Sequence, residues 1–244
     1  MIRVDLNCDL GEGVGRDSAL MPLITSANIA CGAHAGDEAT MRDLVTQAGR
    51  YGVGVGAHPG FADRANFGRR EINLAPHALR QLVIRQICLL CGIGAVRHVK
   101  PHGALYNLAA RDRAIADVVA GAVWEVDRTL FLFALAGSEL AKAGRSRGLI
   151  VAEEVFGDRS YQPDGSLTPR ARADAVLQDE QAVVAQVLQM VQRREVRATD
   201  GSVVKITADT ICLHGDGPNA VRLAEVLRTA LAVARISIRR FGSE

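Results

Sequence analysis

The sequence predicts a single α/β domain in which seven parallel strands alternate with helices and close into a barrel of the (β/α)7 type. The hydrophobic periodicity switches between two and 3.6 residues several times along the chain, which is typical of alternating strands and helices. Such alternation implies parallel pairing through right-handed crossovers. Because no G-x-G-x-x-G dinucleotide fingerprint occurs, seven repeats favour a closed barrel over an open sheet.

The predicted strands are short apolar segments that recur along the whole chain. They cover residues 2–7, 25–30, 53–57, 96–100, 130–134, 148–153 and 209–213. Apolar stripes at i, i+3, i+4 and i+7 predict helices between them over residues 41–48, 79–90, 183–191 and 220–234. Each of these helices therefore has one face that can pack on the barrel.

Composition limits the class of protein further. With 244 residues, 48% of them hydrophobic, the chain can bury one large core, and residues 1–244 are predicted to form one domain. A net charge of +2 argues against nucleic-acid and membrane partners, so small-molecule ligands are expected. The N-terminus lacks a basic flank followed by an apolar stretch, and a cytoplasmic location is expected.

The five cysteines are odd in number and lie mostly in apolar segments, which predicts reduced, buried thiols. Cys88 and Cys91 form a C-x-x-C pair, but they fall within a predicted helix and no second pair occurs. A role in packing is therefore favoured for this pair over a redox or zinc role.

Polar residues gather where the predicted strands end. In a parallel barrel the carboxyl ends of the strands meet at one mouth, where active groups collect. Strand parity also places alternate residues on one face, so Asp5, Asn7 and Asp9 point together. The side chains expected at the mouth are those of Asp9, Glu12, His34, His58, Lys100, His102, His214 and Asp216.

Two segments without helical periodicity interrupt the repeats. The stretch 156–172 is too long for an ordinary connection in a compact domain, and we expect it to be a lid or rim of the site. The stretch 194–205 is expected to form a hairpin around Asp200 and Gly201.

Six motifs in order give the sequence a family resemblance. They are DLNCDLGE at 5–12, ANIACGAHAGD at 27–37, GAHPGFAD with FGRR at 56–70, VKPHGALYN at 99–107, EVFGDRSYQPDGSLTPR at 154–170 and ICLHGDGP at 211–218. Together they resemble the LamB/YcsF family, the A subunit of bacterial 5-oxoprolinase. The resemblance implies a barrel of the glycoside hydrolase/deacetylase kind. It also implies ATP-driven opening of 5-oxo-L-proline to L-glutamate, with ATP delivered with Mg, and separate B and C subunits.

The candidate residues fit that chemistry. Opening a lactam needs groups that hold phosphate or oxyanion charge, a base for water and an acid for the departing nitrogen. Asp9, His58, Lys100 and His102 are the predicted catalytic residues. Substrate or phosphate binding is predicted for Asn7, Glu12, His34, Arg159, His214 and Asp216. No G-x-x-x-x-G-K-[ST] motif occurs, so ATP would bind without a P-loop or across a partner interface.

Some polar residues are better explained by structure. Asp5 is expected to be a buried carboxylate paired with an arginine such as Arg3 or Arg97, and His98 and His77 are expected to be structural.

Two other functions remain open from the sequence. Asp9, His34, His58 and His102 could bind a divalent metal in a deacetylase-like hydrolase, although their spacing alone does not establish a site. The chain could instead be a non-catalytic ligand-binding subunit. The sequence leaves open whether the chain forms homo-oligomers.

Overall fold

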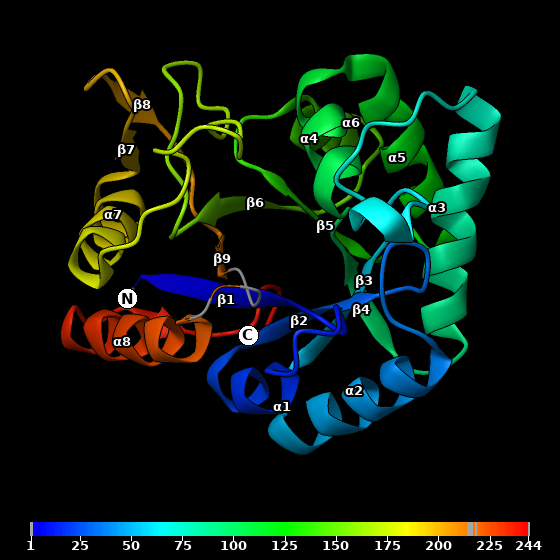
Figure 1. The fold of residues 1–244 in the computed structure, drawn as a ribbon, viewed down its shortest axis with the longest axis horizontal. Helices are drawn as coiled ribbons and strands as arrows, with labels where there is room; N and C mark the ends of the chain where they lie inside the picture. The colour runs from blue at the N-terminus through cyan, green and yellow to red at the C-terminus, as the bar shows by residue number, and fades with distance from the viewer. Residues whose placement is uncertain (1, 214–216, 218, 244) are drawn as a thin grey trace.

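Seven parallel strands close into a barrel in the computed structural model, which describes residues 2–213, 217 and 219–243 (Figure 1). The barrel strands are β1 (Arg3–Leu10), β2 (Ser26–Ala30), β3 (Gly54–His58), β4 (Val96–Val99), β5 (Phe131–Leu135), β6 (Val151–Phe156) and β9 (Thr210–Leu213). They pair in that order, and β9 pairs back with β1, which closes the sheet. The predicted closed barrel is confirmed.

Helices surround the barrel (Figure 1). They are α1 (Asp17–Leu20), α2 (Glu38–Tyr51), α3 (Pro76–Cys91), α4 (Gly103–Arg111), α5 (Arg113–Val126), α6 (Glu139–Ser146), α7 (Glu180–Arg193) and α8 (Ala220–Val233). Two short 3-10 turns, Met21–Leu23 and Arg64–Asn66, complete the helical part. The sequence pattern predicted α2, α3, α7 and α8 and missed α1, α4, α5 and α6. In α5 the buried residues run almost continuously from Val119 to Val123, which hides the amphipathic period.

Local sequence signals explain where α2 begins and ends. Its N-cap residue Asp37 accepts a hydrogen bond from the Thr40 N–H, which satisfies a donor that the first turn leaves free. Met41, Leu44 and Ala48 are buried on one face against the barrel. Gly52 then adopts a φ of 68°, the left-handed conformation that commonly ends a helix.

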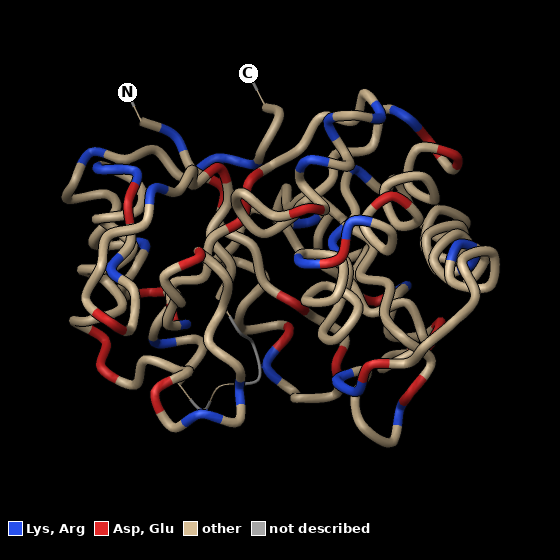
Figure 2. The backbone as a smooth tube through the Cα atoms, turned by 90° about the horizontal axis from the view of Figure 1, so that it is seen from above, with Lys and Arg blue, Asp and Glu red and all other residues tan. Residues whose placement is uncertain are grey.

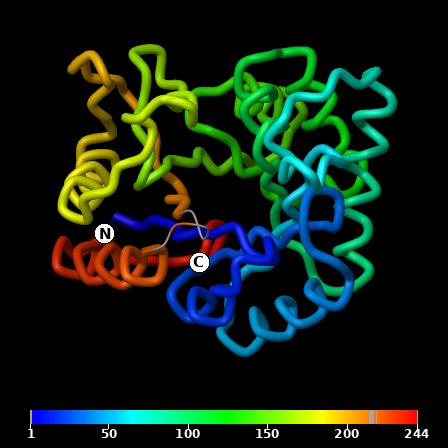
Figure 3. Tube along the Cα trace, viewed as in Figure 1, coloured from blue at the N-terminus to red at the C-terminus, as the bar shows by residue number. Residues whose placement is uncertain are grey.

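The strand boundaries differ most from prediction at β6, which begins and ends three residues later than expected. Glu153 and Glu154 resemble the end of a strand in the sequence, because charged groups are rarely buried. Both glutamates are buried in the structure, and Glu154 is fully enclosed within the barrel. A short strand that was not predicted, β10 (Ser237–Ile238), pairs with the start of β1. The segments 3–4 and 237–238, near the two ends of the chain, therefore lie side by side, and Figure 3 shows the first and last parts of the trace on the same side of the molecule.

Polar groups also fill the end of the barrel away from the mouth. Asp5 is buried and accepts hydrogen bonds from the hydroxyls of Thr25, Ser26 and Thr210. The expected pairing of Asp5 with Arg3 or Arg97 is wrong, because short hydroxyl side chains satisfy the carboxylate without bringing a second charge into the core. The expected structural role of Asp5 fits this arrangement.

His98 on β4 also lies in the barrel interior, next to Asn28 of β2. It is buried, its Nε2 lies 2.8 Å from Asn28 Oδ1, and its ring stacks on Phe133. Gly56 gives the ring its space, because a Cβ there would lie 2.0 Å from His98 Nε2. His77 is exposed in the first turn of α3, as expected for a residue without a site role.

The cysteine prediction is correct for three residues and wrong for two. Cys8, Cys31 and Cys212 are buried and free. Cys88 and Cys91 are exposed on α3, so their predicted packing role is wrong. The inward face of this helix is formed instead by Val83, Ile87 and Leu90.

The two irregular segments have different roles. Residues 194–205 form the predicted hairpin, in which β7 (Glu195–Arg197) pairs antiparallel with β8 (Val203–Lys205). The stretch 156–172 returns to the barrel mouth, and residues 162 and 164–171 line the cavity described below. The prediction of a rim is therefore confirmed for this stretch.

Charged residues of both signs are interspersed along the backbone (Figure 2). This mixture agrees with the small net charge of +2. Among the described residues, no helix is both long enough and apolar enough to cross a membrane.

Candidate functional site

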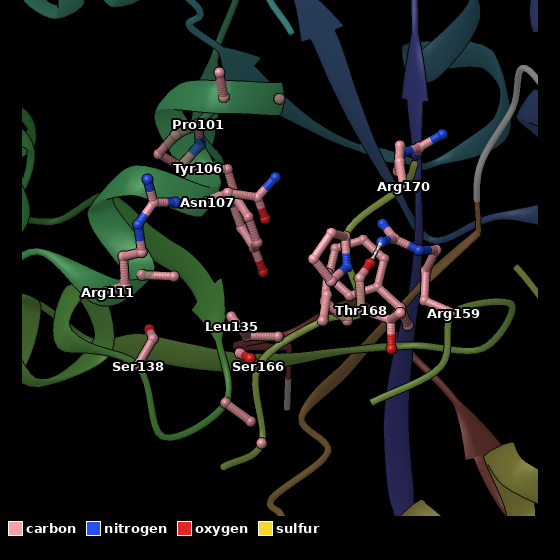
Figure 4. Close-up of a pocket in the computed structure, with 18 of the residues that line it drawn as sticks. Pro101, Tyr106, Asn107, Arg111, Leu135, Ser138, Arg159, Ser166, Thr168 and Arg170 are labelled. Atoms are coloured by element: carbon pink, nitrogen blue, oxygen red, sulfur yellow. Dashed lines mark hydrogen bonds between the residues drawn. The ribbon is translucent and has the colours of Figure 1, made fainter. Parts of the chain in front are cut away.

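The carboxyl ends of the barrel strands surround a cavity of about 920 Å³. Asp9, Glu12, His58, Lys100 and His102 line its inner part. Figure 4 shows the outer part, where Tyr106, Asn107 and Arg111 from α4 lie opposite Arg159, Thr168 and Arg170 of the rim stretch. A volume of this size is typical of small-molecule sites.

Three histidines and one glutamate converge at the inner wall of the cavity. Glu12 Oε1 lies 3.1 Å from His102 Nδ1, 3.5 Å from His34 Nε2 and 3.7 Å from His58 Nε2. His58 Nε2 and His102 Nδ1 are 3.0 Å apart, and the rings of His34 and His102 stack at 3.8 Å. The four residues stand at or just after the ends of β1, β2, β3 and β4, which are neighbours in the sheet, so the curvature of the barrel wall brings them together.

Backbone carbonyl groups fix the orientation of two of these rings. His58 Nδ1 lies 2.7 Å from the Lys100 carbonyl oxygen, and His102 Nε2 lies 2.9 Å from the Phe67 carbonyl oxygen. A carbonyl oxygen only accepts, so each of these nitrogens carries its proton. In the neutral rings, His58 Nε2 and His102 Nδ1 therefore present lone pairs toward Glu12.

The loop 60–68 is shaped to hold this cluster. Phe67 has a φ of 56°, a left-handed conformation that is unfavourable for a bulky side chain, and its carbonyl is the one that orients His102. A Cβ at Gly60 would lie 2.8 Å from His34 Nδ1, and one at Gly68 would lie 2.8 Å from His34 Cβ. These glycines allow the backbone to approach the histidines closely.

Lys100 is buried beside the cluster and contacts several partners at once. Its Nζ lies 2.8 Å from Asp9 Oδ1, 3.0 Å from Glu154 Oε1 and 3.0 Å from Cys212 Sγ, with Asn7 Oδ1 at 3.3 Å. An ammonium group has three N–H donors, and these contacts occupy them. Lys100 therefore positions Asp9 and has no N–H left for a ligand.

The surroundings of Asp9 keep it ionised. Burial raises its pKa, but the charges and hydrogen bonds of His58 and Lys100 outweigh burial and hold the pKa well below its usual value. Burial likewise lowers the pKa of Lys100, but Asp9, Cys212 and Glu154 raise it well above its usual value. Lys100 and Asp9 thus form a buried ammonium-carboxylate ion pair at neutral pH.

In the cluster of Glu12 and the histidines, burial and the neighbouring groups shift the pKa values in opposite directions. Burial raises the pKa of Glu12, but the approach of His102 and His34 lowers it to about 2. Burial lowers the pKa of His34 to about 4, although Glu12 opposes this shift. For His58, burial also lowers the pKa, but Asp9 more than compensates and the pKa is raised.

The structure brings together most of the residues predicted for the site. Asp9, Glu12, His34, His58, Lys100 and His102 form one group, and Asn7 joins it below Lys100. Arg159 lines the same cavity but lies in the rim, where it donates to the carbonyls of Thr168 and Ala175. His214 and Asp216 lie outside the described residues.

Glu154, Asn28 and Tyr106 belong to the site but were not among the predicted residues. Glu154 receives hydrogen bonds from Asn7 Nδ2 and Tyr106 Oη, and it also pairs with Lys100. Asn28 donates from Nδ2 to both Asn7 Oδ1 and Asp9 Oδ1. The signal that was available is strand parity, because Asn28 and Glu154 lie near the ends of apolar strands where a charge or amide must find a partner.

Comparison with known proteins extends these observations to the whole chain. The chain is 50% identical over 253 aligned residues to the A subunit of 5-oxoprolinase from Geobacillus thermodenitrificans, covering 100% of this chain and 99% of that protein. It is 48% identical to the corresponding 5-oxoprolinase protein of Tolumonas auensis, covering 98% and 99%.

A solved structure gives the same result for the fold. The chain matches the crystal structure of the lactam utilization protein from Thermus thermophilus with a TM-score of 0.91 and 40% identity, covering 98% of this chain and 100% of that one. The profile of the LamB/YcsF family matches residues 4–244. The barrel, the polar mouth and these matches agree that the chain belongs to the LamB/YcsF family.

Proposed function

We propose that this chain is the A subunit of an ATP-dependent 5-oxoprolinase. The reaction hydrolyses the lactam of 5-oxo-L-proline to L-glutamate and cleaves ATP to ADP and phosphate. The proposal rests on identity of about half over the full length of two relatives that carry this name, together with a cavity that contains an ionised Asp9.

Asp9 is the proposed base of the reaction. Its Oδ1 is held by Lys100 and Asn28, while Oδ2 lies 3.3 Å from His58 Nε2 at the edge of the cavity. A carboxylate fixed on one oxygen presents the other in a constant direction, which favours proton abstraction from water. The water attacks the lactam carbonyl carbon, the carbon–nitrogen bond breaks, and the nitrogen leaves with a proton.

His58 and His102 are proposed to assist. With its Nδ1 proton engaged by the Lys100 carbonyl, His58 can take or return a proton only through Nε2, which faces Asp9. A protonated His58 would also stabilise the oxyanion that develops on the carbonyl oxygen. Lys100 is proposed to act through Asp9, which it contacts, and Tyr106 is proposed to act through Glu154, which pairs with Lys100.

ATP supplies the driving force in this proposal. An amide is a poor electrophile, and transfer of the γ-phosphoryl group of ATP to the lactam oxygen, with release of ADP, makes the ring carbon more electrophilic. Attack of water and cleavage of the carbon–nitrogen bond then leave an acyl phosphate, which a second water hydrolyses to glutamate and phosphate. The cavity volume of about 920 Å³ is larger than a small lactam requires. The basic residues of its outer part are Arg69, Arg111, Arg159, Arg170 and Lys205. These cations suit phosphate groups, delivered with Mg, while B and C subunits would complete the nucleotide site.

The test is ATP-dependent release of glutamate from 5-oxoproline by the chain reconstituted with candidate B and C subunits. We expect glutamate only when this chain and ATP are both present. An Asp9→Asn variant should lower release by about 10²–10⁴-fold, whereas Asp43→Asn, at an exposed position of α2 outside the cavity lining, serves as a matched control with full activity. Release that continues at the wild-type rate with Asp9→Asn would remove the chain from the chemical step.

A further inference from the structure

We propose that Glu12, His34, His58 and His102 form a binding site for one divalent transition-metal ion, of the class represented by Zn²⁺. The proposal goes beyond the function proposed above, because neither the lactam nor ATP is needed for it. It concerns a site inside the barrel mouth, with one carboxylate and three imidazole ligands.

The spacing of the ligand atoms matches a four-coordinate metal. Bonds of about 2.0–2.1 Å from zinc to nitrogen or oxygen require a separation of about 3.4 Å between neighbouring ligands of a tetrahedron. The distances from Glu12 Oε1 to the three histidines are 3.1, 3.5 and 3.7 Å, and His58 Nε2 lies 3.0 Å from His102 Nδ1. The two remaining separations, from His34 to His58 and from His34 to His102, are at most 4.8 Å. Because the rings of His34 and His102 are stacked, the His34 ring must turn to bring its lone pair onto the ion.

The hydrogen bonds of two rings direct their lone pairs to the same point. His58 Nδ1 and His102 Nε2 both donate to backbone carbonyls, so the other nitrogen of each ring is left without a proton when the ring is neutral. Metal-binding histidines usually have this arrangement, in which the outer nitrogen donates to a carbonyl or carboxylate. Two lone pairs 3.0 Å apart repel each other unless a cation or a proton lies between them.

Glu12 and His34 supply the second, independent observation. Both side chains are more than nine-tenths buried, at 6% and 0% exposure. Even so, Glu12 Oε1, His34 Nδ1 and His34 Nε2 have no aligned hydrogen-bond partner among the described residues. Unpaired polar atoms inside a protein cost roughly 1–3 kcal/mol each, so Glu12 Oε1 and His34 Nε2, which lie 3.5 Å apart, indicate a ligand that the chain itself does not provide.

The formal charge of the site also favours a cation. Three carboxylates, those of Asp9, Glu12 and Glu154, lie in this region, and among the ion pairs of the described residues the one lysine there, Lys100, pairs with Asp9 and Glu154. With neutral histidines this gives two uncompensated negative charges in a buried region. One divalent ion would balance them.

The ligand types select the class of metal. Three imidazoles and one carboxylate suit zinc and its neighbours in the first transition row, whereas Mg²⁺ and Ca²⁺ prefer oxygen ligands in larger number. A metal here would polarise a bound carbonyl or phosphoryl oxygen, and it would occupy the lone pair of His58. Asp9, which is not in the ligand group, would then act as base without His58.

The alternative is a proton shared within the cluster, with His58 as imidazolium. In that case the group would bind no metal at micromolar concentration. The two explanations differ in direct binding measurements, which need neither ATP nor partner subunits.

The experiment uses the full-length chain, treated with a chelator and then dialysed. Zn²⁺ binding is measured by competition with a chromophoric chelator, and bound metal is counted by elemental analysis. We expect one Zn²⁺ per chain, and we expect His34→Ala to weaken binding at least about 100-fold. His77→Ala, which removes an exposed histidine outside the cluster, should bind like wild type.

Glu12→Gln is the second variant, since it keeps the side-chain size and tests the charge if His34→Ala fails to fold. Loss of zinc in Glu12→Gln, with an unchanged unfolding midpoint of the metal-free protein, would support the site. The proposal is overturned if the wild-type chain binds no Zn²⁺, or if both variants bind it as tightly as wild type. Zinc binding without glutamate release would support this site and reject only the proposed function.

Discussion

The two ends of the barrel interior solve the problem of buried polar groups in different ways. At the closed end, Asp5 is surrounded by the hydroxyls of Thr25, Ser26 and Thr210, which donate to both of its oxygens. At the mouth, Asp9 meets Lys100 and His58, and Glu12 keeps an oxygen without an aligned partner. Asp5 and Asp9 lie on the same face of β1, four residues apart.

The difference teaches that burial alone does not identify a functional carboxylate. Burial raises the pKa of Asp5 despite its hydroxyl partners, whereas His58 and Lys100 overcome burial at Asp9 and lower its pKa. A group that is satisfied by neutral neighbours serves the fold. A carboxylate that charged neighbours keep ionised at the edge of a cavity can act as a base on a bound ligand.

The largest expected effect is on turnover at the mouth. Asp9→Asn should lower kcat for glutamate release by about 10²–10⁴-fold, because the base is lost while the side-chain size is kept. Asp5→Asn, on the same strand face, should retain kcat in the folded protein. Steady-state kinetics of the reconstituted enzyme measures both, and equal losses of kcat would remove the distinction between the two ends.

Thr210→Val tests the closed end. The Thr210 hydroxyl donates to Asp5 and accepts from Asn7, so its removal leaves two buried groups short of a partner. We expect the free energy of unfolding to fall by about 1–3 kcal/mol while kcat is retained. Urea denaturation measures the loss, and a variant as stable as wild type would show that these hydroxyls do not support the fold.

His98 gives the lower barrel a dependence on pH. Burial lowers the pKa of His98 from 6.5 to about 3 in the folded protein. Between these values the unfolded chain binds the proton, so stability is complete above the unfolded pKa and falls as the pH falls. At pH 5, protonation of His98 in the unfolded chain lowers the free energy of unfolding by about 2 kcal/mol relative to neutral pH.

The His98→Gln variant, which lacks the titrating ring, should therefore lose less stability than wild type between pH 7 and pH 5. Urea denaturation at the two pH values measures the difference, and the exposed His77→Gln variant should behave like wild type. An identical loss in His98→Gln and wild type would place the acid sensitivity elsewhere.

The smallest effect is expected at the outer rim. Arg111 pairs with Glu71 at 2.6 Å, but both side chains are more than half exposed. Arg111→Ala should change the free energy of unfolding by less than about 1 kcal/mol, since exposed ion pairs contribute little. Thermal unfolding is sufficient to check this, and a larger loss would mean that the rim supports the barrel.

Much of the fold was predictable because each barrel strand has a local signal in the sequence. All seven strands were placed from apolar runs and their polar ends, and six of them began within two residues of the observed position. The exception was β6, where Glu153 and Glu154 interrupt the apolar pattern. Their burial depends on Lys100 and Arg145, residues that are distant in sequence or on another element.

The candidate site was predictable as a set of residues, but not as a geometry. Asp9, His58, Lys100 and His102 stand at strand ends, so the barrel had to bring them to one mouth. Periodicity could not reveal that the donors of Lys100 are occupied by Asp9 and its other partners. It also could not reveal that Glu12 faces the three histidines with an unpaired oxygen.

The sequence by itself determined the order of strands and helices, the polar face of β1 and the family to which the chain belongs, because these depend on local pattern and on similarity along the chain. The tertiary structure alone decided that Asp5 accepts hydrogen bonds from neutral hydroxyls while Asp9 pairs with an ammonium group. Closure of the barrel sets distances of about 3 Å between side chains from separate strands, and at that range in a buried site electrostatic interactions are strongest.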